Sequence, residues 1–394
     1  MPTNRQNTSD FGCQPGFPGD ISTETFLHDY WQKKPLLVKN AFPHIQSPLT
    51  PNELAGLACE DDVNSRLVIE QHKQGPWHVV HGPLNEDDFN ELPATHWTLL
   101  VTDVDKHVPA ARALIDRFRF IPDWRIDDLM ISYAPEGGSV GPHSDAYDVF
   151  LIQALGQRRW MINSDFDDTC LDDTELRILQ HFDAAEDWVL DPGDMLYLPP
   201  NIAHYGIALN DCMTCSVGFR APSVSNMISE YAEFIAAATD REQRYQDPDL
   251  AYQQNPAEIQ RTVLTRIKTL LAMQLAIDDD KLLRWFGEFT SEPRSGLHTE
   301  PPETQYASFH ELCTAFTLET RIAQAPVSKY LYARRQDQAW LFVDGKTYVT
   351  SPAFAAVLSG NRSLATRDVL ASITDPADER VLLDLYNNGQ LLIQ

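Results

Sequence analysis

Three things are scarce in this sequence of 394 residues: cysteine, long apolar runs and basic side chains. Most of the six cysteines are far apart or in unlike contexts, which indicates reduced thiols rather than a disulfide framework. No run of about 18 apolar residues is present, so no segment is expected to span a bilayer. The first twenty residues lack the basic start and the apolar stretch of a signal peptide. These absences predict a cytoplasmic protein with no membrane partner.

The scarcity of basic side chains leaves a strongly acidic chain. It has 31 lysines and arginines against 57 aspartates and glutamates, a formal net charge of −26. A hydrophobic share of 43% excludes a disordered acidic chain. Residues 1–222 carry −19 of the charge, residues 223–305 carry −6 and residues 306–394 carry −1. The charge argues against direct nucleic-acid binding and favours a basic partner; an acidic surface kept for solubility is the alternative.

Turn residues and apolar spacing divide the chain into five parts: a flexible tail 1–20, a strand-rich domain 21–222, a helical segment 223–290, a linker 291–305 and a terminal block 306–394. Short strands in the second part suggest a barrel or jelly roll. They are predicted at 128–134, 147–153, 158–163, 187–190, 194–198 and 212–219. Later helices are predicted at 225–245, 258–290, 308–323, 352–358 and 376–387, with a hairpin of 340–343 and 347–349. The fold class is therefore α+β.

Two motifs in the strand-rich part carry the chemistry. The segment GGSVGPHSDAYDVF holds His143 and Asp145, which project from the same face of a strand because they are two residues apart. The segment DPGDMLYLPPNIAHYG leads to His204. Two histidines and one carboxylate form the facial triad that binds Fe(II) and leaves open coordination positions. An HxD pair alone is more often a pair of solvated surface residues. The second motif, which leads to His204, is what favours a catalytic metal site.

The spacing of these motifs resembles two nested families. The second motif is similar to the second motif of cupin barrels. The order of HxD, a basic residue fifteen positions after the first histidine and a distal histidine resembles the Jumonji-C Fe(II)/2-oxoglutarate oxygenases. That resemblance implies that Arg158 binds the distal carboxylate of 2-oxoglutarate, as a guanidinium can do with two parallel hydrogen bonds. It makes Ser216, on the last barrel strand, a weaker candidate for cosubstrate contact.

Further segments narrow the resemblance to the bacterial ribosomal oxygenases. These segments are DYWQKKPLLVKNAF, PNELAGLACE, PDWRIDDLMISYAPEGGSVGPH, YDVFLIQ and SVGFRAP. The resemblance implies a double-stranded β-helix barrel of the cupin type, a helical dimerisation segment and a winged-helix-like C-terminal domain. It also implies hydroxylation of an arginine in a large-subunit ribosomal protein, the sixteenth, using Fe(II), 2-oxoglutarate and O2 and releasing succinate. The expected partners are that basic ribosomal protein and a second copy of the chain.

Residues that would contact the substrate are less well marked. Asp127 and Asp128 lie on the strand before the HxD turn, and Tyr147 shares the face of His143 and Asp145. The competing interpretation is that each aspartate is an ordinary solvated or turn-capping residue and that Tyr147 belongs to the barrel core. The near-neutral terminal block lacks the basic surface that a nucleic-acid-binding winged helix needs.

Two other functions fit parts of the sequence. One is a cupin-type oxygenase acting on a small molecule, which would rarely need the 172 residues after Pro222. The other is a non-enzymatic ribosome-associated factor, against which the intact triad argues. Cys212 and Cys215 form a CxxC without a second ligand pair, so they are interpreted as barrel residues rather than as a zinc site.

Overall fold

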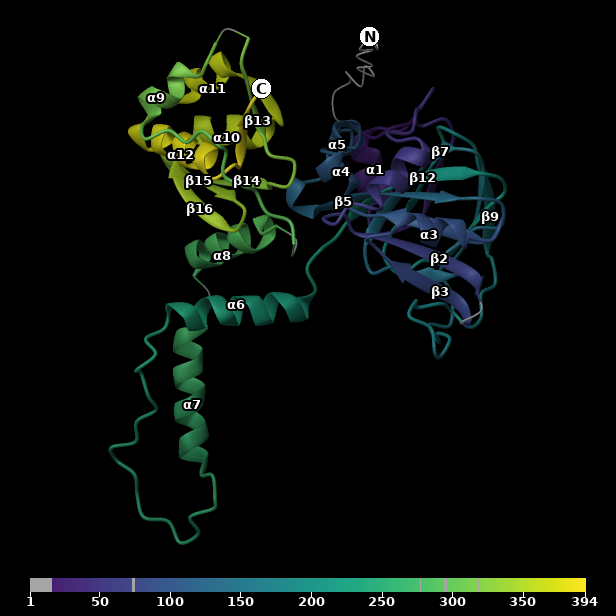
Figure 1. Cartoon of the computed structure of the whole chain (residues 1–394). Helices are drawn as coiled ribbons and strands as arrows, with labels where there is room; N and C mark the ends of the chain where they lie inside the picture. The colour runs from purple at the N-terminus through teal and green to yellow at the C-terminus, as the bar shows by residue number, and fades with distance from the viewer. Residues whose placement is uncertain (1–15, 73–74, 277, 294–295, 318) are drawn as a thin grey trace. The chain divides into compact units, whose positions relative to one another are not determined.

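The computed structural model describes residues 16–72, 75–276, 278–293, 296–317 and 319–394 (Figure 1). The chain forms two compact units, one ending at Ala221 and the other beginning at Pro222. Most of the predicted tail 1–20 lies outside the described residues. Among the described helices, none is long and apolar enough to cross a membrane.

Two antiparallel sheets form the first unit. The larger sheet has the strand order β1-β10-β7-β12-β5-β4-β2-β3, and the smaller has the order β6-β11-β8-β9. Their inner faces share an apolar cluster that includes Leu151 of the larger sheet and Trp160 of the smaller. The strands are β1 Leu36–Val38, β2 Ser65–His72, β3 Gly75–His81, β4 Trp97–Val101, β5 Ile126–Ala134, β6 His143–Ser144, β7 Asp148–Leu155, β8 Arg158–Asn163, β9 Glu186–Leu190, β10 Met195–Leu198, β11 Ala203–Ala208 and β12 Cys212–Phe219.

Helices pack on the outer face of the larger sheet. Phe26, Leu54 and Leu114, each from a different helix, are buried in one cluster with Phe150 and Phe219 of the sheet. Ser22 caps the first helix, and Thr50 and Glu53 form a capping box at the second. The helices are α1 Thr23–Asp29, α2 Pro51–Leu57, α3 Glu86–Asn90, α4 Val104–His107 and α5 Pro109–Asp116, with a 3₁₀ turn at Asp123–Arg125.

A buried carboxylate joins the helical layer to the sheet. Asp148 is fully buried and accepts hydrogen bonds from the Tyr197 hydroxyl at 2.7 Å and the Gln32 amide at 2.9 Å. Arg125 donates a third at 3.1 Å and completes an ion pair. Burial raises the pKa of Asp148, and these three donors offset part of that rise. The network fixes the chain entering β7, which follows the HxD motif.

The second unit contains the remaining elements. They are α6 Val224–Ala238, α7 Arg261–Gln274, α8 Asp279–Ser291, α9 Phe309–Thr314, β13 Arg321–Gln324, β14 Tyr330–Arg335, β15 Gln338–Val343, β16 Lys346–Thr350, α10 Pro352–Gly360, β17 Ser363–Ala365, α11 Thr366–Ser372, α12 Pro376–Asn387 and β18 Leu391–Ile393. Helix α8 packs on the β14-β15-β16 sheet, where Phe342 covers Gly287. Tyr231 of α6 packs edge-to-face against Trp285 of α8.

Three helices predicted from the sequence have other bounds in the structure. The helix over 225–245 stops at Ala238, and 258–290 breaks into α7 and α8. The helix predicted at 308–323 ends at Thr314, and residues from Arg321 form strand β13. Pairing of β13 with both β17 and β18 overrides the helical spacing, because sheet hydrogen bonds are long-range contacts that spacing does not encode.

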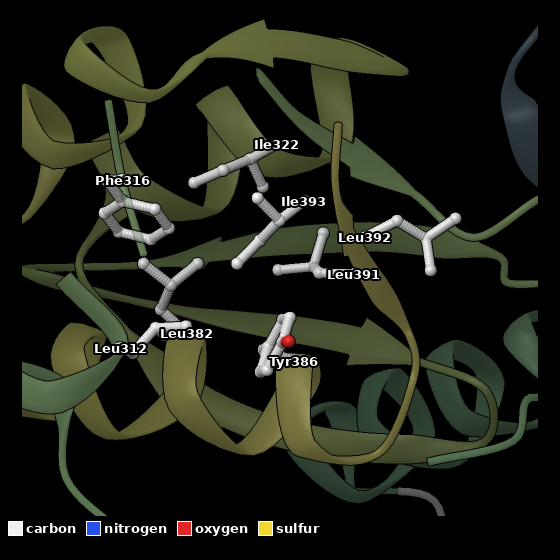
Figure 2. Close-up of a pocket in the computed structure, with 8 residues that line it drawn as sticks. All are labelled: Leu312, Phe316, Ile322, Leu382, Tyr386, Leu391, Leu392 and Ile393. Carbon is white, nitrogen blue, oxygen red and sulfur yellow. The ribbon is translucent and has the colours of Figure 1, made fainter. Parts of the chain in front are cut away.

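The apolar core of the second unit leaves one small hollow. Its lining is entirely apolar except for the Tyr386 hydroxyl, and it encloses about 180 Å³ that protein atoms do not fill, part of it open to solvent. Figure 2 shows the side chains that converge on it, which are Leu312, Phe316, Ile322, Leu382, Tyr386, Leu391, Leu392 and Ile393. With no charged group and a single hydroxyl to orient a ligand, this hollow is a packing defect rather than a reaction site.

We expect Asp148→Ala to lower the free energy of unfolding by about 3–5 kcal/mol, because it leaves the buried Arg125 charge and two further donors without an acceptor. Urea unfolding of the full chain measures the loss. Asp187→Ala is the control, since Asp187 pairs with exposed Arg159 at the surface and should cost less than about 1 kcal/mol. Equal losses for the two variants would contradict the assignment of Asp148 as a buried structural hub.

Candidate metal centre

A glycine-rich turn delivers the first histidine. Gly137 and Gly141 have φ angles of +74° and +79°, a region that favours glycine. A Cβ on Gly138 would overlap the carbonyl oxygen of Trp97. The buried Thr98 hydroxyl of β4 donates to the Ser139 carbonyl at 3.1 Å, which fastens the turn to the larger sheet. The glycines are therefore needed to bring the chain across β4 and into β6.

A second turn prepares the strand of the other histidine. Gly193 has φ +97°, and the Asp194 carboxylate accepts from the backbone N–H groups of Asp191 and Asn40, both at 2.8 Å. Lys39 also pairs with Asp194. The Pro-Gly-Asp turn is thus bound to the chain after β1, and it sets the start of β10. Two prolines then lead into β11, a strand the sequence reading did not identify as one.

The register of the smaller sheet brings the triad together. Strand β11 pairs with β6 so that His204 lies directly opposite His143. The Asn201 N–H donates to the Asp145 carbonyl at 2.7 Å and holds the turn that carries the carboxylate. Asp145 Oδ2 lies 3.9 Å from His143 Nε2 and 3.7 Å from His204 Nε2. One ligand atom from each residue lies within 4.8 Å of the others, a separation that one metal ion can bridge.

Both imidazoles are oriented for metal binding. His143 Nδ1 lies 2.9 Å from the Gly141 carbonyl, and His204 Nδ1 lies 3.0 Å from the Ile202 carbonyl. A carbonyl only accepts, so each Nδ1 carries the proton and each Nε2 presents a lone pair. Burial lowers the pKa of His204, and the neighbouring His143 lowers it further. The His204 ring is therefore neutral at pH 7, the form that coordinates a metal.

Arg158 and Trp160 lie on the inner face of β8, because residues two apart on a strand project from the same side. They are 3% and 6% exposed, whereas Arg159 points outward and pairs with Asp187. Arg158 Nε and Nη2 are buried and have no hydrogen-bond partner among the described residues. The guanidinium carbon lies 5.7 Å from the centre of the Trp160 ring, and that ring lies 5.9 Å from His204. A buried cation without an anion therefore lies in the same barrel interior as the triad.

The three candidate substrate residues gather beside the triad. Burial raises the pKa of Tyr147 above its usual value. The carboxylates of Asp145, Asp128 and Asp127 raise it further, so all three lie near the Tyr147 hydroxyl. Asp128 is buried and accepts a hydrogen bond from the Asp103 N–H at 3.3 Å. Part of its acceptor capacity thus has a structural use, as the competing interpretation holds.

The remaining candidates lie on β12. Ser216 is buried and lies opposite Met130 of β5 and Leu151 of β7, a face it shares with the inner apolar cluster. Cys212 and Cys215 are both free and buried, and they belong to different apolar clusters. The two thiols are thus on opposite sides of the strand, as residues three apart on a strand must be, which agrees with their interpretation as barrel residues.

Comparison with known proteins is consistent with this geometry. The JmjC domain family matches residues 113–227, and the ROXA-like winged helix family matches residues 272–391. The ribosomal protein uL16 3-hydroxylase of Escherichia coli is 42% identical over 293 residues, which are 71% of this chain and 74% of that protein. The chain belongs to the ribosomal oxygenase family. A probable ribosomal oxygenase of Haemophilus influenzae is 42% identical over 59% of this chain and 56% of its own.

Solved structures of a ribosomal oxygenase share the whole architecture. Escherichia coli YcfD matches with a TM-score of 0.83 and 34% identity, over 95% of this chain and 98% of that chain. Two further YcfD structures, each with a TM-score of 0.80, contain cobalt with 2-oxoglutarate and cobalt with succinic acid. The cupin-like JmjC fold with a C-terminal winged helix, predicted from the sequence, is therefore confirmed.

We expect His204→Ala to abolish tight binding of Co(II) to the full chain, with a loss beyond the roughly 10–100-fold that mutation of outer-shell groups causes. Isothermal titration with Co(II) alone measures the affinity and the stoichiometry, expected to be one ion per chain. His28→Ala, at an exposed histidine of α1, is the control and should bind as the wild type does. Unchanged Co(II) affinity in His204→Ala would exclude the triad as the metal site.

Proposed function

We propose that this chain is an Fe(II)- and 2-oxoglutarate-dependent oxygenase that hydroxylates an arginine side chain of a large-subunit ribosomal protein, with uL16 as the first candidate. Membership of the ribosomal oxygenase family supports the reaction class. The observation that carries it in this chain is the pairing of His143, Asp145 and His204 next to a buried arginine without an anion. A ribosomal substrate also agrees with the cytoplasmic location expected from the sequence.

The residues fit the groups that this reaction needs. Two imidazoles and a carboxylate suit Fe(II) and leave open positions for a chelating cosubstrate and O2. Arg158 carries a buried positive charge whose donors lack a partner among the described residues, and a buried charge is stable only when it is paired. The distal carboxylate of 2-oxoglutarate supplies that partner. Ser216 is a second candidate contact on the opposite sheet.

Each group of the chain then has a defined task. Bound iron supplies the oxidising chemistry that couples decarboxylation of 2-oxoglutarate to hydroxylation. His143, Asp145 and His204 hold it from one side and leave the other open. Arg158 orients the cosubstrate, and the apolar inner cluster around Leu151 and Trp160 keeps water out of the barrel.

Acidic groups near the triad match an arginine substrate. Asp127 and Asp128 lie close to the Tyr147 hydroxyl, which places two carboxylates beside the metal centre for a guanidinium to approach. The loop between β8 and β9 adds more negative charge next to the turn that precedes His143. The Leu179 N–H donates to the Pro142 carbonyl at 2.8 Å, so this loop is bound to the turn just before His143. Its acidic residues are Asp165, Asp167, Asp168, Asp172, Asp173, Glu175 and Asp183.

A homodimer is the second part of the proposal. Helix α7 buries none of its residues, and Leu264, Ile267 and Leu271 form an exposed apolar stripe along it. On α6, Ile228 is 66% exposed while Ile235 is buried. Such stripes on a chain of this size mark a surface that another chain covers. The family resemblance and the self-complementary nature of helical stripes favour a second copy of this chain.

Mass spectrometry of purified large-subunit ribosomal protein tests the reaction. With Fe(II), 2-oxoglutarate and O2, wild-type enzyme should add one oxygen atom to an arginine of uL16 and release an equal amount of succinate, while His204→Ala should do neither. Ribosomes from a deletion strain should lack the same modification. If small metabolites stimulate the turnover of 2-oxoglutarate and ribosomal proteins do not, the result would instead support a small-molecule oxygenase.

Light scattering of the purified chain tests the dimer. The wild type should have twice the mass of one chain, and Ile267→Asp with Leu271→Asp should have the mass of a single chain, because two buried charges oppose the contact. Thr269→Asp also introduces a negative charge on the exposed surface of α7, but on the side of the helix opposite the stripe, so it should leave the dimer intact. A monomeric wild type would refute this part of the proposal.

A further inference from the structure

Three buried donor atoms on one face of β8 have no acceptor. They are Nε and Nη2 of Arg158 and the indole Nε1 of Trp160, none of which has a hydrogen-bond partner among the described residues. Buried N–H groups are almost always satisfied, and each one left unpaired costs about 1–3 kcal/mol. Three of them in one place indicate an acceptor that arrives from outside the chain.

The donors are close enough to share one acceptor group. Arg158 and Trp160 project from the same face two residues apart, and the guanidinium carbon lies 5.7 Å from the centre of the indole ring. A carboxylate offers two oxygens with about four lone-pair positions, so it can accept from a guanidinium and an indole together. A single water would satisfy the indole but would leave the arginine charge unpaired.

Gly206 fixes the orientation of the indole. It pairs directly with Trp160 across β8 and β11, and a Cβ at Gly206 would lie 2.7 Å from two carbons of the six-membered ring. The six-membered ring of the indole therefore contacts the backbone of β11 at the glycine, where a side chain would not fit. Gly206 is two residues after His204, so the same strand holds a metal-binding imidazole and the surface on which the indole rests.

We propose that Trp160 is a further cosubstrate-binding residue, whose indole N–H donates to the same distal carboxylate that Arg158 binds. The inference rests on the proposed function, because it assigns 2-oxoglutarate to this barrel. It adds a donor that neither the motif spacing nor the family resemblance marked.

Binding of 2-oxoglutarate to the full-length, Mn(II)-loaded protein without oxygen, measured by isothermal titration, tests the proposal. Trp160→Phe keeps an aromatic ring and removes the N–H, and it should weaken 2-oxoglutarate binding about tenfold, as loss of a hydrogen bond to a charged group does. Its affinity for Mn(II) should stay within twofold of the wild type. Succinate retains the distal carboxylate, so its affinity should also fall about tenfold in Trp160→Phe.

Trp188→Phe is the matched control, because Trp188 pairs with Trp160 across β8 and β9 and also packs on the inner cluster. It should bind 2-oxoglutarate as the wild type does. If Trp160→Phe does not fold, benzothienylalanine at position 160 replaces only the N–H by sulfur and should show the same tenfold loss. Wild-type affinity in either Trp160 variant, or an equal loss in Trp188→Phe, would overturn the inference.

Arg158→Ala separates this inference from the proposed function. If Arg158→Ala loses 2-oxoglutarate binding while Trp160→Phe does not, the cosubstrate site stands and the role of the indole falls. If the wild type binds no 2-oxoglutarate, or if Arg158→Ala binds it as well as the wild type, the cosubstrate site itself is wrong and the inference falls with it.

Discussion

The pairing of two short strands is the constraint on which the rest of the centre depends. Strand β6 is only two residues long, yet its register with β11 sets His143 opposite His204. Because side chains alternate along a strand, a slip of one residue would turn His204 away from His143 and Asp145. The glycine turn fastened to Thr98 and the Asn201–Asp145 backbone hydrogen bond exclude that slip. The metal geometry is thus set by backbone contacts made before any ion binds.

The interior of the barrel also contains a buried positive charge, that of Arg158. Alternation on β8 sends Arg158 inward, where it is 3% exposed, and sends Arg159 outward to a surface ion pair. An isolated buried cation destabilises a fold unless an anion reaches it. The apolar inner cluster around it offers no such anion. This unpaired buried charge is the basis of the proposal that Arg158 binds a carboxylate of the cosubstrate.

The two units differ in how far their apolar residues are buried. The first unit buries them between its sheets and under its helices, and it concentrates negative charge on the loop that is bound to the turn before His143. In the second unit, α8 is packed on a sheet, whereas the apolar stripe of α7 stays exposed. The candidate metal centre and the exposed stripe of α7 thus lie in different units of the chain.

The sequence by itself determined the chemistry of this protein and most of its strands. The spacing of His143, Asp145, Arg158 and His204 predicted a ligand set and a cosubstrate residue, and the structure brings the two histidines and Asp145 together as a candidate metal site. Tertiary structure alone decided where pairing between distant strands overrides the helix or strand that the local apolar spacing favours. It made β11 a strand and Arg321–Gln324 a strand rather than a helix, and it buried Asp148 among Gln32, Arg125 and Tyr197. It also laid the Trp160 ring on Gly206. Hydrogen bonds between distant segments set these features, and no local spacing records which segments will meet.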